Sequence, residues 1–257
     1  MSNTQPQRVV ITAGASGIGL AIAERYLANG ARVMVCDVQQ DAIDQACITY
    51  PVLTGCVADV GIPAQVEQFI DKAQAELGGI DVLVNNAGIG GPKATVEDID
   101  YQAWDDCLRI NLSGMFYCAK GVVPGMKAQG HGSIINISTA STKTGLPHRL
   151  PYVASKAGVL GLTHNLAREL GPFNIRCNVI LPGKIDNPRG DALTQRYADE
   201  HNMSFTDAED LRLQYISMRS KVKPSEIGDM AVFLASDRAK HITAQEIAVD
   251  GNSEWEI

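Results

Sequence analysis

The sequence predicts an α/β fold: a doubly wound parallel sheet with helices on both faces, in a single domain over residues 1–257. Three observations predict it. Short β-branched apolar runs alternate with amphipathic stretches of ten or more residues, and parallel strands need such long crossovers. The hydrophobic fraction is 45%, which is enough for a sizeable core. No Pro- or Ser-rich linker and no internal repeat divides the chain.

In the first half of the chain the alternation begins with a strand at 8–12 (RVVIT). A helix is expected at 17–29, and Gly30 ends it because glycine readily adopts a left-handed cap. Strand 32–36, helix 39–48 and strand 52–57 repeat the pattern. The helix at 63–77 has Pro63 in its first turn, where a missing N–H is tolerated, and the next strand is 80–84.

The second half continues with a long helix at 101–127, a strand at 133–137, a helix at 152–170, and strands at 175–180 and 246–249. Within this half, the stretch 186–218 is polar and only weakly periodic. It fits a surface excursion and a substrate lid about equally well.

Charge and composition exclude several classes of function. The chain has 22 basic and 29 acidic residues, so it lacks the basic surplus of a nucleic-acid or polybasic membrane binder. No apolar run approaches the ~20 residues that span a bilayer, and the polar stretch 1–7 lacks the apolar core of a signal peptide.

Six scattered cysteines without a CxxC pair predict buried free thiols in the cytoplasm. The histidines show no metal-ligand spacing, so no metal is expected.

A glycine-rich turn, Thr12–Gly19 (TAGASGIG), follows the first predicted strand. Its glycines allow close approach of the backbone to a diphosphate, and the next helix offers unpaired N–H groups at its N-terminus. Asp37 lies 18 residues beyond Gly19, near the spacing expected for a carboxylate that binds ribose hydroxyls. A carboxylate there repels the 2′-phosphate of NADP, and Val38 follows it instead of Arg or Lys, so NAD is the expected cofactor. The alternative is that Asp37 merely caps a helix.

Further motifs stand in order along the chain: Ala58-Asp59-Val60, Asn85-Asn86-Ala87-Gly88, Asn111, Tyr152-Val153-Ala154-Ser155-Lys156, Pro182-Gly183 and Ile247-Ala248-Val249-Asp250-Gly251. Tyr152 and Lys156 are four residues apart and so share one helix face. Together with TAGASGIG, these motifs resemble the short-chain dehydrogenase/reductase family over nearly the whole chain. The resemblance implies a Rossmann-type fold and an enzyme that interconverts a secondary alcohol and a ketone by hydride transfer.

The resemblance also implies residue roles. Tyr152 is the implied acid–base group, Lys156 favours its phenolate and holds the nicotinamide ribose, and Asn111 anchors a water in a proton relay. Thr139 stands where the family usually has a serine; Ser138 or Ser141 takes that role if the register shifts. The implied cofactor-binding residues are Gly14, Ser16, Gly17, Ile18, Gly19, Asp37, Asp59, Val60, Asn86, Gly88, Tyr152, Lys156, Pro182, Gly183 and Ile185.

Two other positions depart from the family pattern. Asn187 is the nearest stand-in for a threonine that often follows the Pro-Gly turn, where it binds the carboxamide of the cofactor. Ala244 replaces a usual glycine, a change that we expect to be neutral.

The substrate remains open between two classes. Six basic residues are expected around the pocket mouth, and they favour a carboxylate, phosphate or sulfonate on the substrate: Lys93, Lys143, His148, Arg149, Lys184 and Arg189. If these are only solvated loop charges, a sugar, polyol or cyclic alcohol fits as well. A weakly catalytic NAD-binding sensor or scaffold is the alternative function, supported only by Thr139.

The family resemblance implies a homotetramer, because the helices 101–127 and 152–170 form a dimer interface in the family. These helices carry more apolar residues than one sheet face can cover. Examples are Met115, Phe116, Val122, Val159, Leu160 and Leu162.

Overall fold

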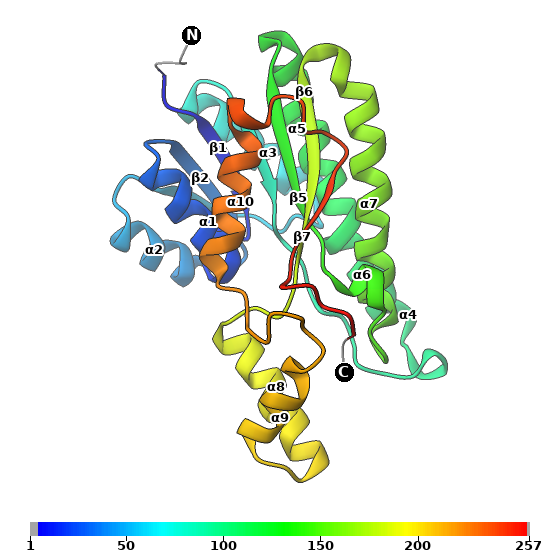
Figure 1. Cartoon of the computed structure of the whole chain (residues 1–257). Helices are drawn as coiled ribbons and strands as arrows, with labels where there is room; N and C mark the ends of the chain where they lie inside the picture. The colour runs from blue at the N-terminus through cyan, green and yellow to red at the C-terminus, as the bar shows by residue number, and fades with distance from the viewer. Residues whose placement is uncertain (1–4, 256–257) are drawn as a thin grey trace.

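The computed structural model describes residues 5–255 and confirms the doubly wound α/β fold (Figure 1). Residues 1–4, part of the stretch in which no signal peptide is expected, lie outside the described range. All seven strands pair in parallel, in the order β3-β2-β1-β4-β5-β6-β7. Their bounds are β1 (Arg8–Thr12), β2 (Arg32–Asp37), β3 (Thr54–Val57), β4 (Val82–Asn85), β5 (Gly132–Ile137), β6 (Ile175–Pro182) and β7 (Glu246–Val249).

Helices cover both faces of this sheet. One face packs against α1 (Gly17–Ala28), α2 (Gln40–Thr49) and α10 (Pro224–Ala235), the other against α3 (Pro63–Leu77), α5 (Gly114–Gln129) and α7 (Leu150–Leu170). Strand β1 shows why: Val9 and Ile11 point into one layer, and Val10 points into the opposite layer. All three are fully buried, so each face of β1 contributes to a core.

The helix predicted at 101–127 is interrupted. It consists of α4 (Tyr101–Leu108), a π-helical turn (Arg109–Ser113) and α5. Wider turns of this kind often occur at functional sites, and this one contains Asn111, whose buried side chain bonds to the backbone of Ile89. The remaining short helices are α6 (Ser141–Thr144) and 3₁₀ turns at Val96–Asp98, Gly171–Phe173 and Asp237–Ala239.

The polar stretch 186–218 contains two helices, α8 (Pro188–His201) and α9 (Phe205–Leu213), that project beyond the sheet (Figure 1). Lys184 pairs with Glu209 of α9, and Lys221 contacts Asp186, Asp191 and Glu209 within 3.2 Å. These ion pairs hold α8 and α9 to the segments that enter and leave them. The sequence patterns predict none of these helices, nor α10.

Three of the six apolar residues expected at a subunit interface are buried inside the chain itself. Met115, Val122 and Val159 are at most 2% exposed within the protomer, so that part of the prediction is wrong. Phe116 is 48% exposed, so it can still contribute to a subunit interface.

Ala244 has a φ of +58°, a left-handed conformation that costs an L-residue energy. The expectation that alanine is neutral here is therefore also wrong.

All six cysteines are unpaired, and four of them are buried. Within residues 5–255, no helix has the length and apolar character needed to cross a bilayer. Over the same range, no three His, Cys, Asp or Glu side chains gather as a metal site would require.

Candidate active site

A cavity of about 660 Å³ opens at the carboxyl ends of the strands, where ligands bind in open α/β sheets. The sheet order reverses between β1 and β4, and the loops after both strands line the cavity. Of the catalytic and cofactor-binding residues that the resemblance implies, those that line it are Ser16, Gly17, Ile18, Asp37, Asn86, Gly88, Thr139, Tyr152, Lys156, Pro182, Gly183 and Ile185. Gly14, Gly19, Asp59, Val60 and Asn111 lie outside the lining.

The glycine-rich turn divides into packing and lining positions. A Cβ on Gly14 would lie 2.5 Å from a methyl carbon of Val35, and one on Gly19 would overlap the carbonyl oxygen of Ala13. These two glycines therefore allow helix α1 and the turn to pack closely. Ala13 lines the cavity with a φ of +48°, and Gly17 does so with a φ of +53°. Ala13 was missed because alanine gives no sequence signal for this conformation.

The start of α1 can receive an anion. Its N-cap residue, Ser16, makes no side-chain capping bond, and the first turn contains no acidic residue. Ser16, Gly17 and Ile18 line the cavity, so the positive dipole end of the helix lies beside it, without a side-chain cap or an acid to neutralise it. This cradle fits the diphosphate of a dinucleotide.

Asp37 ends β2 and is only 8% exposed. Its carboxylate accepts long bonds from the backbone N–H groups of Ala15 (3.4 Å) and Gln39 (3.3 Å). The residue that caps α2 is Gln39, so the interpretation of Asp37 as a helix cap is wrong. Asp37 instead presents a buried carboxylate to the cavity at one end.

Asp59 and Val60 follow β3 but do not reach the cavity. The Asp59 carboxylate lies 3.6 Å from the guanidinium of Arg109 in the π-helical turn. Val60 is 5% exposed and packs beneath Gly114, where an added Cβ would lie 2.8 Å from its methyl group. Both residues thus contact the interrupted helix in this structure.

Asn86 joins the loop after β4 to the glycine-rich turn. Its side-chain amide donates to the carbonyl oxygens of Thr12 (3.2 Å) and Ala13 (3.1 Å). Two residues later, a Cβ on Gly88 would lie 3.1 Å from both Asn111 Oδ1 and Lys156 Nζ. The absence of a side chain at Gly88 therefore leaves these two polar atoms a shared space.

Tyr152 and Lys156 lie one turn apart on α7, and both line the cavity. Lys156 is only 4% exposed, and its Nζ donates to the carbonyl oxygen of Ile137 at 2.8 Å. Burial lowers the pKa of the Lys156 ammonium to about 8. The cavity therefore holds a phenol and a perturbed lysine on the same helix, as the spacing in the sequence predicts.

Thr139 follows β5 and is 8% exposed. Its hydroxyl oxygen lies 3.1 Å from that of Ser141, and both residues line the cavity. The Ser138 hydroxyl instead donates to the backbone carbonyl of Lys156 at 2.9 Å. The geometry thus favours Thr139 or Ser141 over Ser138 as a hydroxyl donor to substrate.

Asn111 lies one layer behind the cavity and is fully buried. Its Oδ1 accepts from the Ile89 N–H at 2.7 Å, and its Nδ2 donates to the Ile89 carbonyl at 2.9 Å and to Ser155 Oγ at 3.0 Å. The sulfur of Cys107 lies 3.3 Å from the same Nδ2. Asn111 therefore fixes the loop after β4 relative to α7.

The opposite wall comes from the segment after β6 and from α8. The Asn187 side-chain oxygen accepts the N–H of Gly190 at 2.7 Å and so caps α8, although Asn187 also lines the cavity. Of the six basic residues expected at the mouth, Arg149, Lys184 and Arg189 line the cavity, and Lys93, Lys143 and His148 do not. Arg212 and Trp255 also line it and were missed, because they come from segments without a motif.

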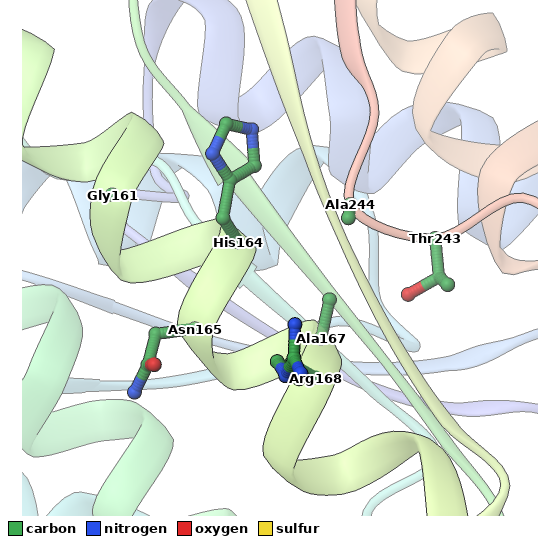
Figure 2. Close-up of a pocket in the computed structure, with 7 residues that line it drawn as sticks. All are labelled: Gly161, His164, Asn165, Ala167, Arg168, Thr243 and Ala244. Atoms are coloured by element: carbon green, nitrogen blue, oxygen red, sulfur yellow. The ribbon is translucent and has the colours of Figure 1, made fainter.

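A second depression, of about 480 Å³, lies away from these residues, between α7 and the segment before β7. Figure 2 shows His164 and Arg168 on α7 with Thr243 and Ala244 beside them. The His164 ring lies 3.1 Å from the carboxylate of Glu246. None of the proposed site residues belongs to this depression.

Known proteins match the chain over almost its full length. A family model described as "Enoyl-(Acyl carrier protein) reductase" matches residues 12–252. The granaticin polyketide synthase putative ketoacyl reductase 1 of Streptomyces violaceoruber is 36% identical over 248 residues, covering 94% of this chain and 91% of the relative. An actinorhodin polyketide ketoreductase structure with NADPH superposes with a TM-score of 0.93, at 31% identity and 99% coverage of both chains. For NAD⁺-bound xylitol dehydrogenase the TM-score is 0.91, at 26% identity, with 97% of this chain and 100% of that chain covered.

These matches agree with the ordered motifs, the parallel sheet and the cavity at the carboxyl ends of its strands. We conclude that the chain belongs to the short-chain dehydrogenase/reductase family, whose members are oxidoreductases that use a nicotinamide cofactor.

Proposed function

We propose that this protein interconverts a secondary alcohol and a ketone with NAD, and that Tyr152 is its acid–base group. The observation that carries the proposal is a single cavity with Tyr152, Lys156 and Thr139 in its lining together with the Ser16–Ile18 cradle and Asp37. Phenol, ammonium, hydroxyl and an anion-binding helix end are the groups that such a reaction needs.

NAD is proposed over NADP because of Asp37. Its buried carboxylate can accept hydrogen bonds from the two ribose hydroxyls, whereas a 2′-phosphate beside it would leave two like charges unpaired. Val38, the next residue, is 62% exposed and offers no cation to a phosphate.

In the proposed chemistry the hydride and the proton of the alcohol go to different acceptors. A bound nicotinamide ring supplies the hydride acceptor for oxidation and the hydride donor for reduction. In oxidation, the Tyr152 phenolate accepts the proton of the substrate hydroxyl; in reduction, the phenol gives a proton to the carbonyl oxygen. The Lys156 ammonium, one helical turn away, favours the phenolate electrostatically. Thr139 donates a hydrogen bond to the substrate oxygen as negative charge develops there.

In this proposal Lys156 and a water held by Asn111 carry the proton onward. Asn111 Oδ1 has a second lone pair beyond the bond to Ile89, and it shares the space beside Gly88 with Lys156 Nζ. A water held there by Asn111 links the ammonium to solvent.

The direct test is Tyr152→Phe with a panel of secondary alcohols and ketones. A phenyl ring cannot move a proton, so turnover should be lost while NADH binding, followed by its fluorescence, stays nearly unchanged. Turnover by the wild-type protein is the necessary reference. If the wild type binds NADH but converts no member of the panel, the sensor or scaffold function replaces this proposal.

We also propose a homotetramer, supported by the exposed Phe116 on α5. Sedimentation of the wild-type protein at micromolar concentration tests it, and a stable monomer would contradict it.

A further inference from the structure

We infer that the substrate carries a carboxylate, sulfonate or phosphate, and that the guanidinium groups of Arg149 and Arg189 bind it. The inference rests on the proposed alcohol–ketone activity and names the class of substrate for the same cavity. It selects one of the two classes that the sequence leaves open.

The charge of the cavity is opposite to that of the whole chain, whose net charge is −7. Asp37 is the one acid among the described lining residues. The basic residues of the lining are Arg149, Lys156, Lys184, Arg189 and Arg212. A cavity with this excess of cations attracts an anion and raises its local concentration.

Arg149 is held in place through one of its three side-chain nitrogens. It precedes α7 directly, and its Nη1 donates to the carbonyl oxygens of Gly90 (3.1 Å) and Gly91 (3.0 Å). No hydrogen bond within residues 5–255 uses its Nε or Nη2 groups. That edge of a guanidinium fits the two oxygens of a carboxylate, or two oxygens of a sulfonate or phosphate.

The backbone before Arg149 is also fixed. His148 has a φ of +62°, an uncommon conformation for a residue other than glycine, and its carbonyl oxygen accepts the Ala94 N–H at 3.0 Å. Such strain tends to be retained where a side chain must be positioned. Arg149 is thus preorganised, which lowers the entropy cost of binding a ligand.

Arg189 of α8 approaches Arg149 over Gly90. A Cβ on Gly90 would lie 3.1 Å from Arg189 Nη2 and 3.3 Å from Arg149 Nη1. Within the described chain, neither arginine has a carboxylate at salt-bridge distance. Burial lowers the pKa of Arg149, and the charges of Arg189 and Arg196 lower it further. Two neighbouring cations without an acid are stabilised by an anion between them.

Another basic residue of the lining already has a partner, and the phosphates of a dinucleotide have a separate site. Lys184 is paired with Glu209. The diphosphate of a dinucleotide has its own cradle at Ser16–Ile18, where α1 begins. Arg149 instead stands one helical turn, about 5 Å along the axis, from Tyr152. The anionic group is therefore expected only a few bonds from the carbon that bears the hydroxyl.

The kinetic test compares matched substrates with NAD present: 3-hydroxybutyrate, 2-hydroxypropane-1-sulfonate and 2-hydroxypropyl phosphate against the neutral methyl ester of 3-hydroxybutyrate. The variants are Arg189→Met and Arg149→Met, with Arg168→Met as control. Arg168 is an exposed arginine of α7 in the second depression. Arg189→Met is decisive, because Arg149→Met also removes the bonds to Gly90 and Gly91.

We expect the wild type to prefer at least one anionic substrate over the ester. Arg189→Met should raise KM for that anion about tenfold or more, the size of a lost bond to a charged group. It should affect kcat/KM for the ester much less than kcat/KM for the anion, and Arg168→Met should change neither. An equal effect on ester and anion, or an unchanged KM, overturns the inference while the alcohol–ketone function stands.

A binding measurement separates the two proposals further. Calorimetry titrates malonate, methanesulfonate and methyl phosphate into the protein with and without NADH. Wild-type binding of at least one anion that Arg189→Met weakens about tenfold supports the inference, and the best ligand identifies the chemistry. No binding of any of the three overturns it, as does a loss of NADH affinity in Arg189→Met, since the arginine would then serve the cofactor. If no alcohol or ketone is converted, the proposed function fails, and this binding result alone decides the anion site.

Discussion

The hydroxyl oxygens of Thr139, in the loop after β5, and of Ser141, the first residue of α6, lie 3.1 Å apart. The backbone N–H of Ser141 also donates to the Thr139 oxygen, at 3.3 Å. Thr139 is thereby oriented by its neighbour, so the threonine can fill the position where a serine is usual.

Thr139→Val keeps the shape of the side chain and removes the hydroxyl. We expect kcat to fall by roughly 10²–10³, the size of one lost donor to a developing oxyanion. Thr139→Ser should keep or raise activity, because it keeps the hydroxyl and removes the methyl group. Steady-state kinetics on one substrate checks both. Near-full activity of Thr139→Val together with collapse in Ser141→Ala would assign the role to Ser141.

Cofactor choice depends on Asp37. In the double variant Asp37→Ala, Val38→Arg, the buried carboxylate is replaced by a nearby cation, so the preference should move from NAD toward NADP. Each change affects a charged contact, and the ratio of the two kcat/KM values should shift by roughly 10–100-fold. Equal use of both cofactors by the unmodified protein would contradict the role of Asp37.

Lys156 should make stability depend on pH in the absence of cofactor. Burial lowers its pKa from 10.5 to about 8 in the folded protein. Between these values the unfolded chain binds the proton more fully than the folded protein. The contribution of Lys156 to the free energy of unfolding therefore rises as the pH goes from about 8 to 10.5. Below about pH 8 the ammonium is buried in the folded protein, and it destabilises the fold by the full amount.

Lys156→Met removes the destabilisation that comes from burying the Lys156 ammonium. We expect the variant to be inactive yet about 1–3 kcal/mol more stable at pH 7, with the difference narrowing toward pH 10.5. Denaturant unfolding at both pH values measures it. Lys120→Met, at an exposed lysine of α5, serves as control and should leave the profile unchanged. A Lys156→Met protein less stable at pH 7 than the wild type would show that the ammonium stabilises the fold.

Ala244 offers a change that should stabilise the protein. Its φ of +58° suits glycine, so Ala244→Gly should add about 1 kcal/mol and raise the Tm by roughly 2–4 °C. Ala75→Gly, at an exposed position of helix α3, should instead lower the Tm, because glycine weakens a helix. Thermal unfolding compares the three proteins, and a lower Tm for Ala244→Gly would contradict the strain.

The sequence predicted the parts of the site that follow a strand or share a helix. Asp37 ends a strand, and Tyr152 and Lys156 are one turn apart, so periodicity and spacing predicted where these side chains lie, whereas their roles came from the family resemblance. The conformations of Ala13 and Ala244 could not be predicted, because each depends on how the chain packs and not on the residue itself.

Contacts between distant segments were also beyond the sequence. Arg149 and Arg189 were both expected at the pocket mouth, but they belong to different elements, and their approach to each other at Gly90 is visible only in the structure. Helix α8 was missed because its outer face is polar and few of its residues reach a core: only Thr194 and Ala198 are buried. The sequence pattern of Met115 and Val159 fits a subunit interface equally well. In the structure both are buried in a cluster with Val179 and Leu181 of β6.

The ion pairs around Lys184 and Lys221 have a consequence for how this fold can diversify. Every charged group in that cluster lies between residues 184 and 221: Lys184, Asp186, Asp191, Glu209 and Lys221. The segment therefore carries its own stabilising contacts and includes no residue of the seven strands. Exchanging it between relatives, by recombination or by design, would replace Arg189 and Arg212 in the cavity while Tyr152 and Lys156 keep their positions on α7.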